Sequence, residues 1–190
     1  MKIGIYGGSF NPPHNGHKDI LKTLLNCGVV DKVYIVPTGR NYVKPGLEKF
    51  EHRRNMLDLC FENESNIEIV DIEDRDTQVY TYMTLDYFRE RNSKDAIYFI
   101  MGSDNLKTFK SWKEYKYMID NYNFIVIIRD NDNVEELKEI FNSDKFVFFE
   151  NVSKLSSSFV REELNNNQNI ESYLDKKVAN YIKENNLYKE

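Results

Sequence analysis

Short apolar runs rich in β-branched and aromatic residues recur along the chain, and the segments between them carry apolar residues at helical spacing. The runs occupy residues 2–6, 32–36, 67–70, 96–101, 124–128 and 146–149. Their length is typical of buried strands. Strands that alternate with helices in this way predict an α/β protein with a Rossmann-like, mostly parallel, doubly wound sheet and helices on both faces.

The same pattern predicts where helices begin and end. Between the first two runs an apolar stripe starts at Ile20, and Gly28 stands where a helix C-terminus is expected. A second helix is expected to begin near Glu51. Thr81 is the expected N-cap of a third helix that reaches Arg91.

The C-terminal part of the chain has a different pattern. After residue 149 no strand-like run follows, and an asparagine-rich turn at 165–169 precedes an amphipathic stretch at 173–188. We expect a small helical segment over about 155–190 that packs on the sheet. Because the turn is too short for a domain linker and no repeat is visible, a single domain is expected over residues 1–190.

Composition narrows the class of protein. The net charge of −5 and the pI of about 5.4 argue against a protein that holds nucleic acid by bulk electrostatics. The longest apolar stretches are too short to cross a bilayer, and the N-terminus lacks the apolar core of a signal peptide. Cys27 and Cys60 lie far apart and form no CxxC pair, so a disulfide framework is not expected. We expect a soluble, cytoplasmic protein with neither a membrane nor a nucleic-acid partner.

The segment GGSFNPPHNGH, residues 7–17, follows the first predicted strand. Open α/β sheets bind ligands at this edge, and the next helix points its N-terminal amides at any anion there. The segment matches neither GxGxxG nor GxxxxGK[ST]. Gly7 and Gly8 would let the backbone approach a phosphate, while Pro12 and Pro13 would hold the loop in shape. The competing interpretation is a tight strand-to-helix turn with exposed histidines.

His14 and His17 stand three residues apart at the start of the first predicted helix. Paired imidazoles there can donate hydrogen bonds to phosphate, and their protonated form is favoured beside a polyanion. Zinc is a competing interpretation, but a catalytic zinc site needs a third protein ligand and only His52 remains among the histidines. We therefore predict no metal bound by protein ligands.

A second candidate phosphate site lies in LSSSFVR, residues 155–161. Ser156, Ser157 and Ser158 offer an N-cap and exposed amides, and Arg161 offers a bidentate donor. A triple serine before a helix is by itself an ordinary cap. Together with the first segment, it favours a site that binds several phosphates.

Both segments resemble signatures of the nucleotidyltransferase superfamily of adenylyl- and cytidylyltransferases. Residues 14–17 match its [HT]xGH element, and LSSSFVR is similar to its ISSTxIR element. The segments VPTGR, FEHRRNML, VYTYMTL, MGSDN, KSWKEY and YIKENNLY resemble bacterial nicotinate-nucleotide adenylyltransferases in order and spacing over essentially the whole chain.

The resemblance implies a role for each matching residue, with His14 and His17 as the catalytic pair. The implied ATP-binding residues are Gly7, Gly8, Ser9, Phe10, His14, Gly16, His17, Gly102, Asp104, Ser156, Ser157, Ser158 and Arg161. The implied acceptor-binding residues are Lys44, Thr81, Tyr82 and Trp112. Trp112 could stack on a pyridine ring or be a core aromatic. The family's PPHK-type segment reads NYVK at 41–44, which leaves the shape of that loop open.

Two charged patterns have more than one interpretation. Lysines recur every third residue from Lys107 to Lys116, with aromatic residues between them. On one helix these would form adjoining stripes, either a basic strip for an anion or, as we expect, a solvated face beside a buried one. The acidic run from Glu73 to Asp76 is expected to be a solvated loop.

The resemblance implies adenylyl transfer from ATP to nicotinate mononucleotide, which gives deamido-NAD and pyrophosphate in NAD biosynthesis. Mg²⁺ is expected to arrive with ATP, and self-association into a homo-oligomer is left open. Another acceptor, such as nicotinamide mononucleotide or phosphopantetheine, is a competing hypothesis. So are a non-catalytic nucleotide-binding protein of the same fold and a nucleic-acid-binding module.

Overall fold

The fold was established from a computed structural model that describes residues 1–129, 132–150, 153 and 155–189. Within these residues six strands form one sheet: β1 (Lys2–Gly8), β2 (Lys32–Pro37), β3 (Ile67–Ile69), β4 (Ala96–Gly102), β5 (Asn123–Ile128) and β6 (Phe146–Glu150). Their order is β3-β2-β1-β4-β5-β6, and every pairing is parallel. The predicted Rossmann-like α/β sheet is confirmed, and it is parallel throughout these pairings.

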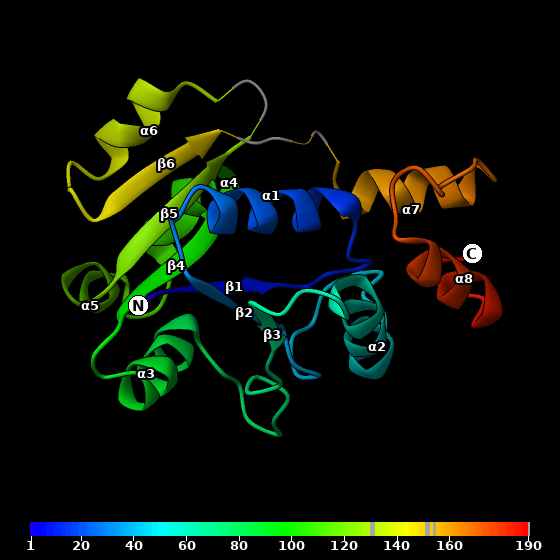
Figure 1. Ribbon diagram of the computed structural model, residues 1–190, viewed down its shortest axis with the longest axis horizontal. Helices are drawn as coiled ribbons and strands as arrows, with labels where there is room; N and C mark the ends of the chain where they lie inside the picture. Colours follow the sequence, from blue (N-terminus) through cyan, green and yellow to red (C-terminus); the bar gives the residue numbers. More distant parts are fainter. Residues whose placement is uncertain (130–131, 151–152, 154, 190) are drawn as a thin grey trace.

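Helices cover both faces of the sheet (Figure 1). They are α1 (Asn15–Asn26), α2 (Phe50–Phe61), α3 (Thr81–Arg91), α4 (Ser103–Thr108), α5 (Tyr115–Asn121), α6 (Val134–Ile140), α7 (Ser157–Asn165) and α8 (Lys176–Glu184), with a 3-10 turn, η1 (Phe109–Ser111), after α4. Buried side chains of α1, α2, α7 and α8 share one apolar cluster, and those of α3 to α6 share another. The chain is therefore doubly wound.

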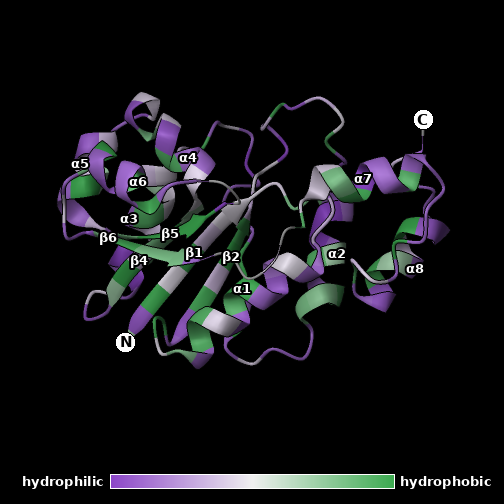
Figure 2. Cartoon of the chain, turned by 90° about the horizontal axis from the view of Figure 1, so that it is seen from above, coloured by the Kyte–Doolittle hydropathy of each residue, from purple (hydrophilic) through white to green (hydrophobic). Residues whose placement is uncertain are grey.

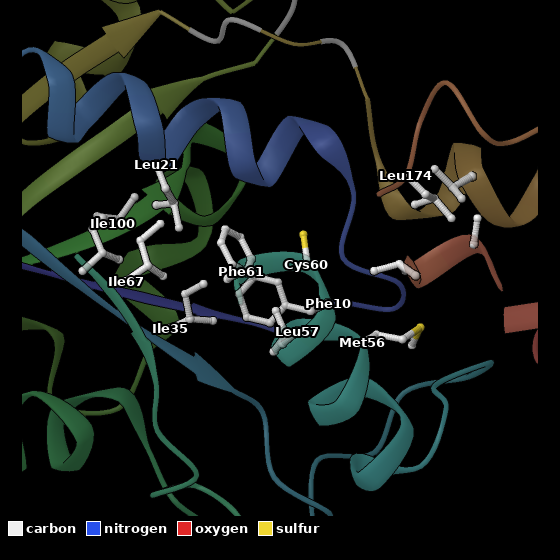
Figure 3. Packing of buried hydrophobic residues seen from close by; sticks show 14 of the residues in the cluster. Phe10, Leu21, Ile35, Met56, Leu57, Cys60, Phe61, Ile67, Ile100 and Leu174 are labelled. Carbon is white, nitrogen blue, oxygen red and sulfur yellow. The ribbon is translucent and has the colours of Figure 1, made fainter. Parts of the chain in front are cut away.

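The first cluster joins the C-terminal helices to the sheet (Figure 3). Leu21 of α1, Ile35 of β2 and Leu57 of α2 are fully buried in it, and Leu174 enters from the segment before α8. The aromatic ring of Phe10, from the loop after β1, is buried here as well. The strands are largely hydrophobic, and α8 has a hydrophobic side and a hydrophilic side (Figure 2). No described helix is long and apolar enough to cross a membrane.

Three helices end in the same way. Gly28 follows α1 with φ +64°, and the Val29 N–H donates to the Leu24 carbonyl at 3.0 Å, as in a Schellman motif. The helix end that was predicted at Gly28 is thus confirmed. Asn167 and Asn186 take the left-handed position after α7 and α8, with φ of 54° and 50°. Asparagine tolerates this conformation better than most side chains.

Two local predictions are wrong. Thr81 is the first residue of α3 and not its N-cap; Tyr80 holds the cap position in an extended conformation, and its side chain does not cap the helix backbone. The lysines from Lys107 to Lys116 do not share a helix, because α4, η1 and α5 succeed one another there and Glu114 has a left-handed φ of 58°. The stripes therefore do not run along one helix, although all four lysines are exposed and Phe109 is buried, as expected.

Candidate active site

A cleft of about 760 Å³ opens at the carboxyl edge of the sheet. It lies where the strand order reverses, with Gly7 and Gly8 at the end of β1 and Gly102 at the end of β4 in its wall. Loops after two neighbouring strands leave toward opposite faces at such a switch point, which creates a crevice for a ligand.

Most residues that the sequence singled out line this cleft. They are Gly7, Gly8, Ser9, Phe10, His14, His17, Lys44, Thr81, Gly102, Asp104, Trp112, Ser156, Ser157, Ser158 and Arg161. The two candidate phosphate-binding segments, residues 7–17 and 155–161, thus line one cavity although they are far apart in sequence. Their roles toward a ligand remain predictions.

Gly16 and Tyr82 are not among the lining residues. A Cβ on Gly16 would lie 2.9 Å from Ser153 Oγ and 3.0 Å from His14 Nδ1, so glycine permits close packing behind the cleft wall. Tyr82 packs edge-on against Tyr117 with ring centroids 6.5 Å apart. Tyr80, the residue before α3, lines the cleft, whereas Tyr82 in the first turn of α3 packs against α5.

Hydrogen bonds join the two motif segments directly. Ser157 Oγ donates to the Pro12 carbonyl at 2.8 Å, and Arg161 Nη1 donates to the Asn11 carbonyl at 2.7 Å. Ser156 is the N-cap of α7, as predicted, and accepts from the Phe159 N–H at 3.1 Å. The N-terminus of α7 is therefore held against the loop that follows β1.

His14 and His17 form a stacked pair at the start of α1. Their ring centroids are 3.7 Å apart, and the His14 N–H donates to His17 Nδ1 at 3.1 Å. Phe10 packs edge-on against His17 at 5.2 Å, and Tyr6 lies 6.0 Å away. His17 is thus enclosed by other rings, and its Nδ1 is already used as an acceptor.

Burial of these rings lowers their basicity. Desolvation, aided by the charge of Arg129, lowers the pKa of His14 from 6.5 to about 4. The pKa of His17 falls well below its usual value, chiefly through desolvation and then through His14 and Arg129. The lowered pKa values favour neutral rings near pH 7, and the protonated form that was expected beside a polyanion stays a prediction.

Basic side chains outnumber acidic ones among the described residues of the cleft wall. The basic ones are Lys44, Lys113, Arg129 and Arg161, and the acidic ones are Glu73 and Asp104. Arg129 Nε lies 3.3 Å from Asp104 Oδ1, and both are about half exposed or more. A Cβ on Gly102 would lie 2.3 Å from Asp104 Oδ1, so a larger residue there would require this exposed carboxylate to move. The wall therefore suits a polyanion.

The sequence interpretation missed Arg129. It follows β5 directly, and its N–H donates at 3.0 Å to Ser103 Oγ at the start of α4, which follows the neighbouring strand β4. Its position after the predicted strand at 124–128 was a usable signal, because every parallel strand delivers its next residue to the same edge.

Arg53 was missed for a different reason. It lies on the buried face of α2, is 1% exposed, and donates to the carbonyl oxygens of Ser9 at 2.9 Å, Thr38 at 2.7 Å and Glu48 at 3.0 Å. Ser9 and Thr38 both line the cleft. The guanidinium thus ties α2 to the loops after β1 and β2, and no sequence pattern distinguishes it from a solvated arginine.

The acidic run is not the solvated loop that was expected. Glu73 lies in the cleft wall and accepts from Thr84 Oγ1 at 2.7 Å, and burial raises its pKa. Asp74 binds Arg40 through both carboxylate oxygens. A Cβ on Gly39 would lie 1.8 Å from the Glu73 carbonyl oxygen, so the loops after β2 and β3 touch through their backbones.

Trp112 belongs to both the cleft and the core. It packs edge-on against Phe99 at 6.1 Å and Phe109 at 5.3 Å, and its side chain also lines the cleft. One part of the indole is therefore fixed by aromatic neighbours while another part is available to a ligand.

His52 does not complete a metal site with the other histidines. Its Nδ1 lies 2.9 Å from the hydroxyl of Tyr181, between α2 and α8. Among the described residues, no group of three His, Cys, Asp or Glu side chains is placed to hold a metal ion.

Comparison with known proteins places this site in a family. The model of the cytidylyltransferase-like family matches residues 5–163. A curated probable nicotinate-nucleotide adenylyltransferase of Acholeplasma laidlawii is 37% identical over 189 residues, which is 98% of this chain and 97% of that protein. The corresponding protein of Fusobacterium nucleatum is 36% identical over 96% of this chain and 97% of its own length.

A solved structure agrees with these sequence relatives. The structure of Plasmodium falciparum nicotinic acid mononucleotide adenylyltransferase complexed with NaAD matches with a TM-score of 0.85 and 28% identity, covering 99% of this chain and 97% of that one. The chain belongs to the cytidylyltransferase-like family and, within it, groups with the nicotinate-nucleotide adenylyltransferases.

Proposed function

We propose that the protein transfers the adenylyl group of ATP to nicotinate mononucleotide, forming deamido-NAD and pyrophosphate in NAD biosynthesis. An oxygen of the acceptor phosphate bonds to the α-phosphorus of ATP. The bond from that phosphorus to the bridging oxygen breaks, and the electron pair leaves with pyrophosphate. Full-length similarity to nicotinate-nucleotide adenylyltransferases supports both the reaction and the acceptor.

The observation that carries this proposal is the union of two phosphate-binding segments in one cleft. Ser157 and Arg161 hydrogen-bond to the carbonyls of Pro12 and Asn11, so the N-terminus of α7 and the start of α1 face one cavity. Two helix N-termini at one site direct the positive ends of two helix dipoles toward a chain of phosphates. A single-phosphate ligand would not require both.

The chemistry needs alignment and charge stabilisation rather than a protein nucleophile. Both substrates are anions, and negative charge grows on the leaving pyrophosphate. Because His17 Nδ1 accepts from the backbone, the neutral ring carries its proton on Nε2 and can donate it as a hydrogen bond. We assign His14, His17, Arg129 and Arg161 to the phosphates of ATP.

Mg²⁺ is proposed to enter as the ATP complex. The described residues present no group of three candidate ligands, so they do not fit a cage made wholly of protein ligands. Mg²⁺ commonly uses substrate phosphates and waters with one or two carboxylates. Asp104, at the start of α4 in the cleft wall, is the candidate for such a carboxylate.

The acceptor is proposed to occupy the side of the cleft formed by Lys44, Tyr80, Thr81 and Trp112. Lys44 would face its phosphate, and the indole of Trp112 would stack on the pyridine ring. With ATP and nicotinate mononucleotide as its small-molecule partners, we propose that the protein acts in the cytoplasm.

Initial rates of pyrophosphate release test the proposal. ATP is offered with nicotinate mononucleotide, nicotinamide mononucleotide or phosphopantetheine, each at matched concentration. We expect kcat/KM to be highest for nicotinate mononucleotide. Faster release with either other acceptor would reassign the acceptor, and ATP binding without acceptor-dependent release would indicate a non-catalytic nucleotide-binding protein.

A further inference from the structure

After α8 the chain turns back toward the loop that follows β1. α8 ends in a Schellman motif, with Asn186 at φ 50° and the Leu187 N–H bonded to the Ile182 carbonyl at 3.1 Å. This turn directs the next residues inward, and Leu187 and Tyr188 are only 6% and 9% exposed. Leu187 and Tyr188 are therefore part of the core.

Tyr188 is held in an unusual backbone conformation. Its φ is 60°, in the left-handed region that a tyrosine rarely adopts and that persists only when surrounding contacts enforce it. Its N–H donates to Glu48 Oε1 at 3.3 Å, and its hydroxyl donates to Asn11 Oδ1 at 2.9 Å. The hydroxyl thus contacts the loop that follows β1 without lining the cleft.

Asn11 connects this hydroxyl to the acceptor side of the cleft. It lines the cleft yet is 4% exposed, and its Oδ1 also accepts from the Glu48 N–H at 3.1 Å. Its Nδ2 donates to the Gly46 carbonyl at 2.7 Å. The side chain of Asn11 therefore ties the segment that carries Lys44 to the loop after β1.

The backbone of Asn11 serves the ATP side independently. Its carbonyl accepts from Arg161 Nη1 at 2.7 Å, whereas its side chain bonds Gly46, Glu48 and Tyr188. A substitution that removes the side-chain hydrogen bonds of Asn11 therefore loosens residues 46–48 and leaves the bond from Arg161 to the Asn11 carbonyl in place. The two halves of the site can thus be perturbed separately.

We propose that Tyr188 is a positioning residue for the acceptor: through Asn11 it holds residues 44–48 in place beside the cleft. This inference rests on the proposed adenylyl transfer. It assigns a functional role to the C-terminal segment, which does not itself line the cleft.

The test uses Tyr188→Phe, with Tyr181→Phe as the matched control. The first change removes one hydroxyl and keeps the ring, and it leaves Asn11 Oδ1 with the Glu48 N–H. We expect the acceptor KM to rise about three- to tenfold, in line with the loss of one buried hydrogen bond, while the ATP KM and kcat stay within about twofold. Tyr181 lies on α8 and its hydroxyl contacts Asn55 and His52 away from the cleft wall, so its variant should leave both KM values unchanged.

A double-mutant cycle separates a relay through Asn11 from general weakening of the fold. If Tyr188 acts through Asn11, adding Tyr188→Phe to Asn11→Ala raises the acceptor KM no further. Multiplicative effects in the double variant would overturn the relay. So would a Tyr188→Phe enzyme that is indistinguishable from the Tyr181→Phe control.

Amide hydrogen exchange provides a readout that does not depend on activity. Peptides covering 44–48 should exchange faster in Tyr188→Phe than in wild type or in the control, because the tether through Asn11 is weakened. Unchanged exchange there would refute the tether. If wild type released no pyrophosphate with any acceptor, the proposed function would have failed and exchange would still decide the tether.

Discussion

At the scale of single residues, the geometry around His17 determines its protonation. Its ring lies among those of Tyr6, Phe10 and His14, and its Nδ1 accepts from the backbone at 3.1 Å. The sequence indicated that both histidines belong to the cleft. It could not indicate that their rings are neutral, because desolvation depends on neighbours from other parts of the fold.

Removal of the His17 ring tests its role in the reaction. We expect His17→Ala to lower kcat/KM about 10²- to 10³-fold, as loss of a donor to developing charge typically does. His52→Ala is the control, since His52 lies between α2 and α8 and contacts Tyr181. Steady-state rates of pyrophosphate release give the comparison. A His17→Ala enzyme within a few-fold of wild type would exclude the assigned role.

The lowered pKa of His14 makes stability depend on pH. In the folded protein its pKa is lowered from 6.5 to about 4, so the unfolded chain binds more protons between these values. Its contribution to the free energy of unfolding is complete above about pH 6.5 and is lost as pH falls toward 4, by about 1.4 kcal/mol per pH unit at most.

Urea unfolding between pH 7 and 4 measures this linkage. We expect His14→Gln to lose less stability over that range than wild type, because glutamine takes up no proton. Titrating carboxylates contribute equally to both proteins and cancel in the difference. Parallel pH profiles for the two proteins would show that His14 is not held neutral by the fold.

At the scale of elements, backbone conformation at the helix ends is the most predictable feature. The φ of +64° at Gly28 and the serine cap at Ser156 both followed from local sequence. The cap at Tyr80 did not, because the side chain there makes no cap hydrogen bond and tertiary contacts place the helix start. The interrupted helix at Lys107–Lys116 likewise reflects packing of Phe109 and Trp112, which periodicity alone does not reveal.

Gly28→Ala isolates the cost of the left-handed turn after α1. No described atom lies within 4 Å of a Cβ built there, so the substitution meets no steric contact. We expect it to lower the free energy of unfolding by about 1 kcal/mol, and Gly28→Asn to lower it less. Urea titration measures both. Equal stability of alanine and glycine at this position would mean that the turn relaxes without cost.

At the scale of the whole molecule, the site arises because distant segments converge on one switch point. The alternation of strands and helices predicted a doubly wound, mostly parallel sheet, and the strand order that the structure shows places the ends of β1 and β4 side by side. The sequence also identified the two segments, 7–17 and 155–161, that meet in the cleft. It did not reveal Arg53 or Glu73, whose environments are built from three separate loops.

The C-terminal helices contribute more to the site than cover for the sheet. Ser157 and Arg161 of α7 hydrogen-bond to the loop that follows β1. Tyr188, in the segment after α8, hydrogen-bonds to Asn11 in the same loop. Both helices share a buried cluster with α1 and α2 (Figure 3). The cleft is therefore built and held by segments from both the N-terminal and the C-terminal parts of the chain.

The central claim, that an adenylyl group passes from ATP to the acceptor, is tested most directly by following the α-phosphorus. Wild-type protein is incubated with nicotinate mononucleotide and ATP labelled at either the α- or the γ-phosphate. If the adenylyl group is transferred, the α-label appears only in the dinucleotide product and the γ-label only in pyrophosphate. Transfer of the γ-label to the acceptor, or release of pyrophosphate that does not depend on the acceptor, would contradict it.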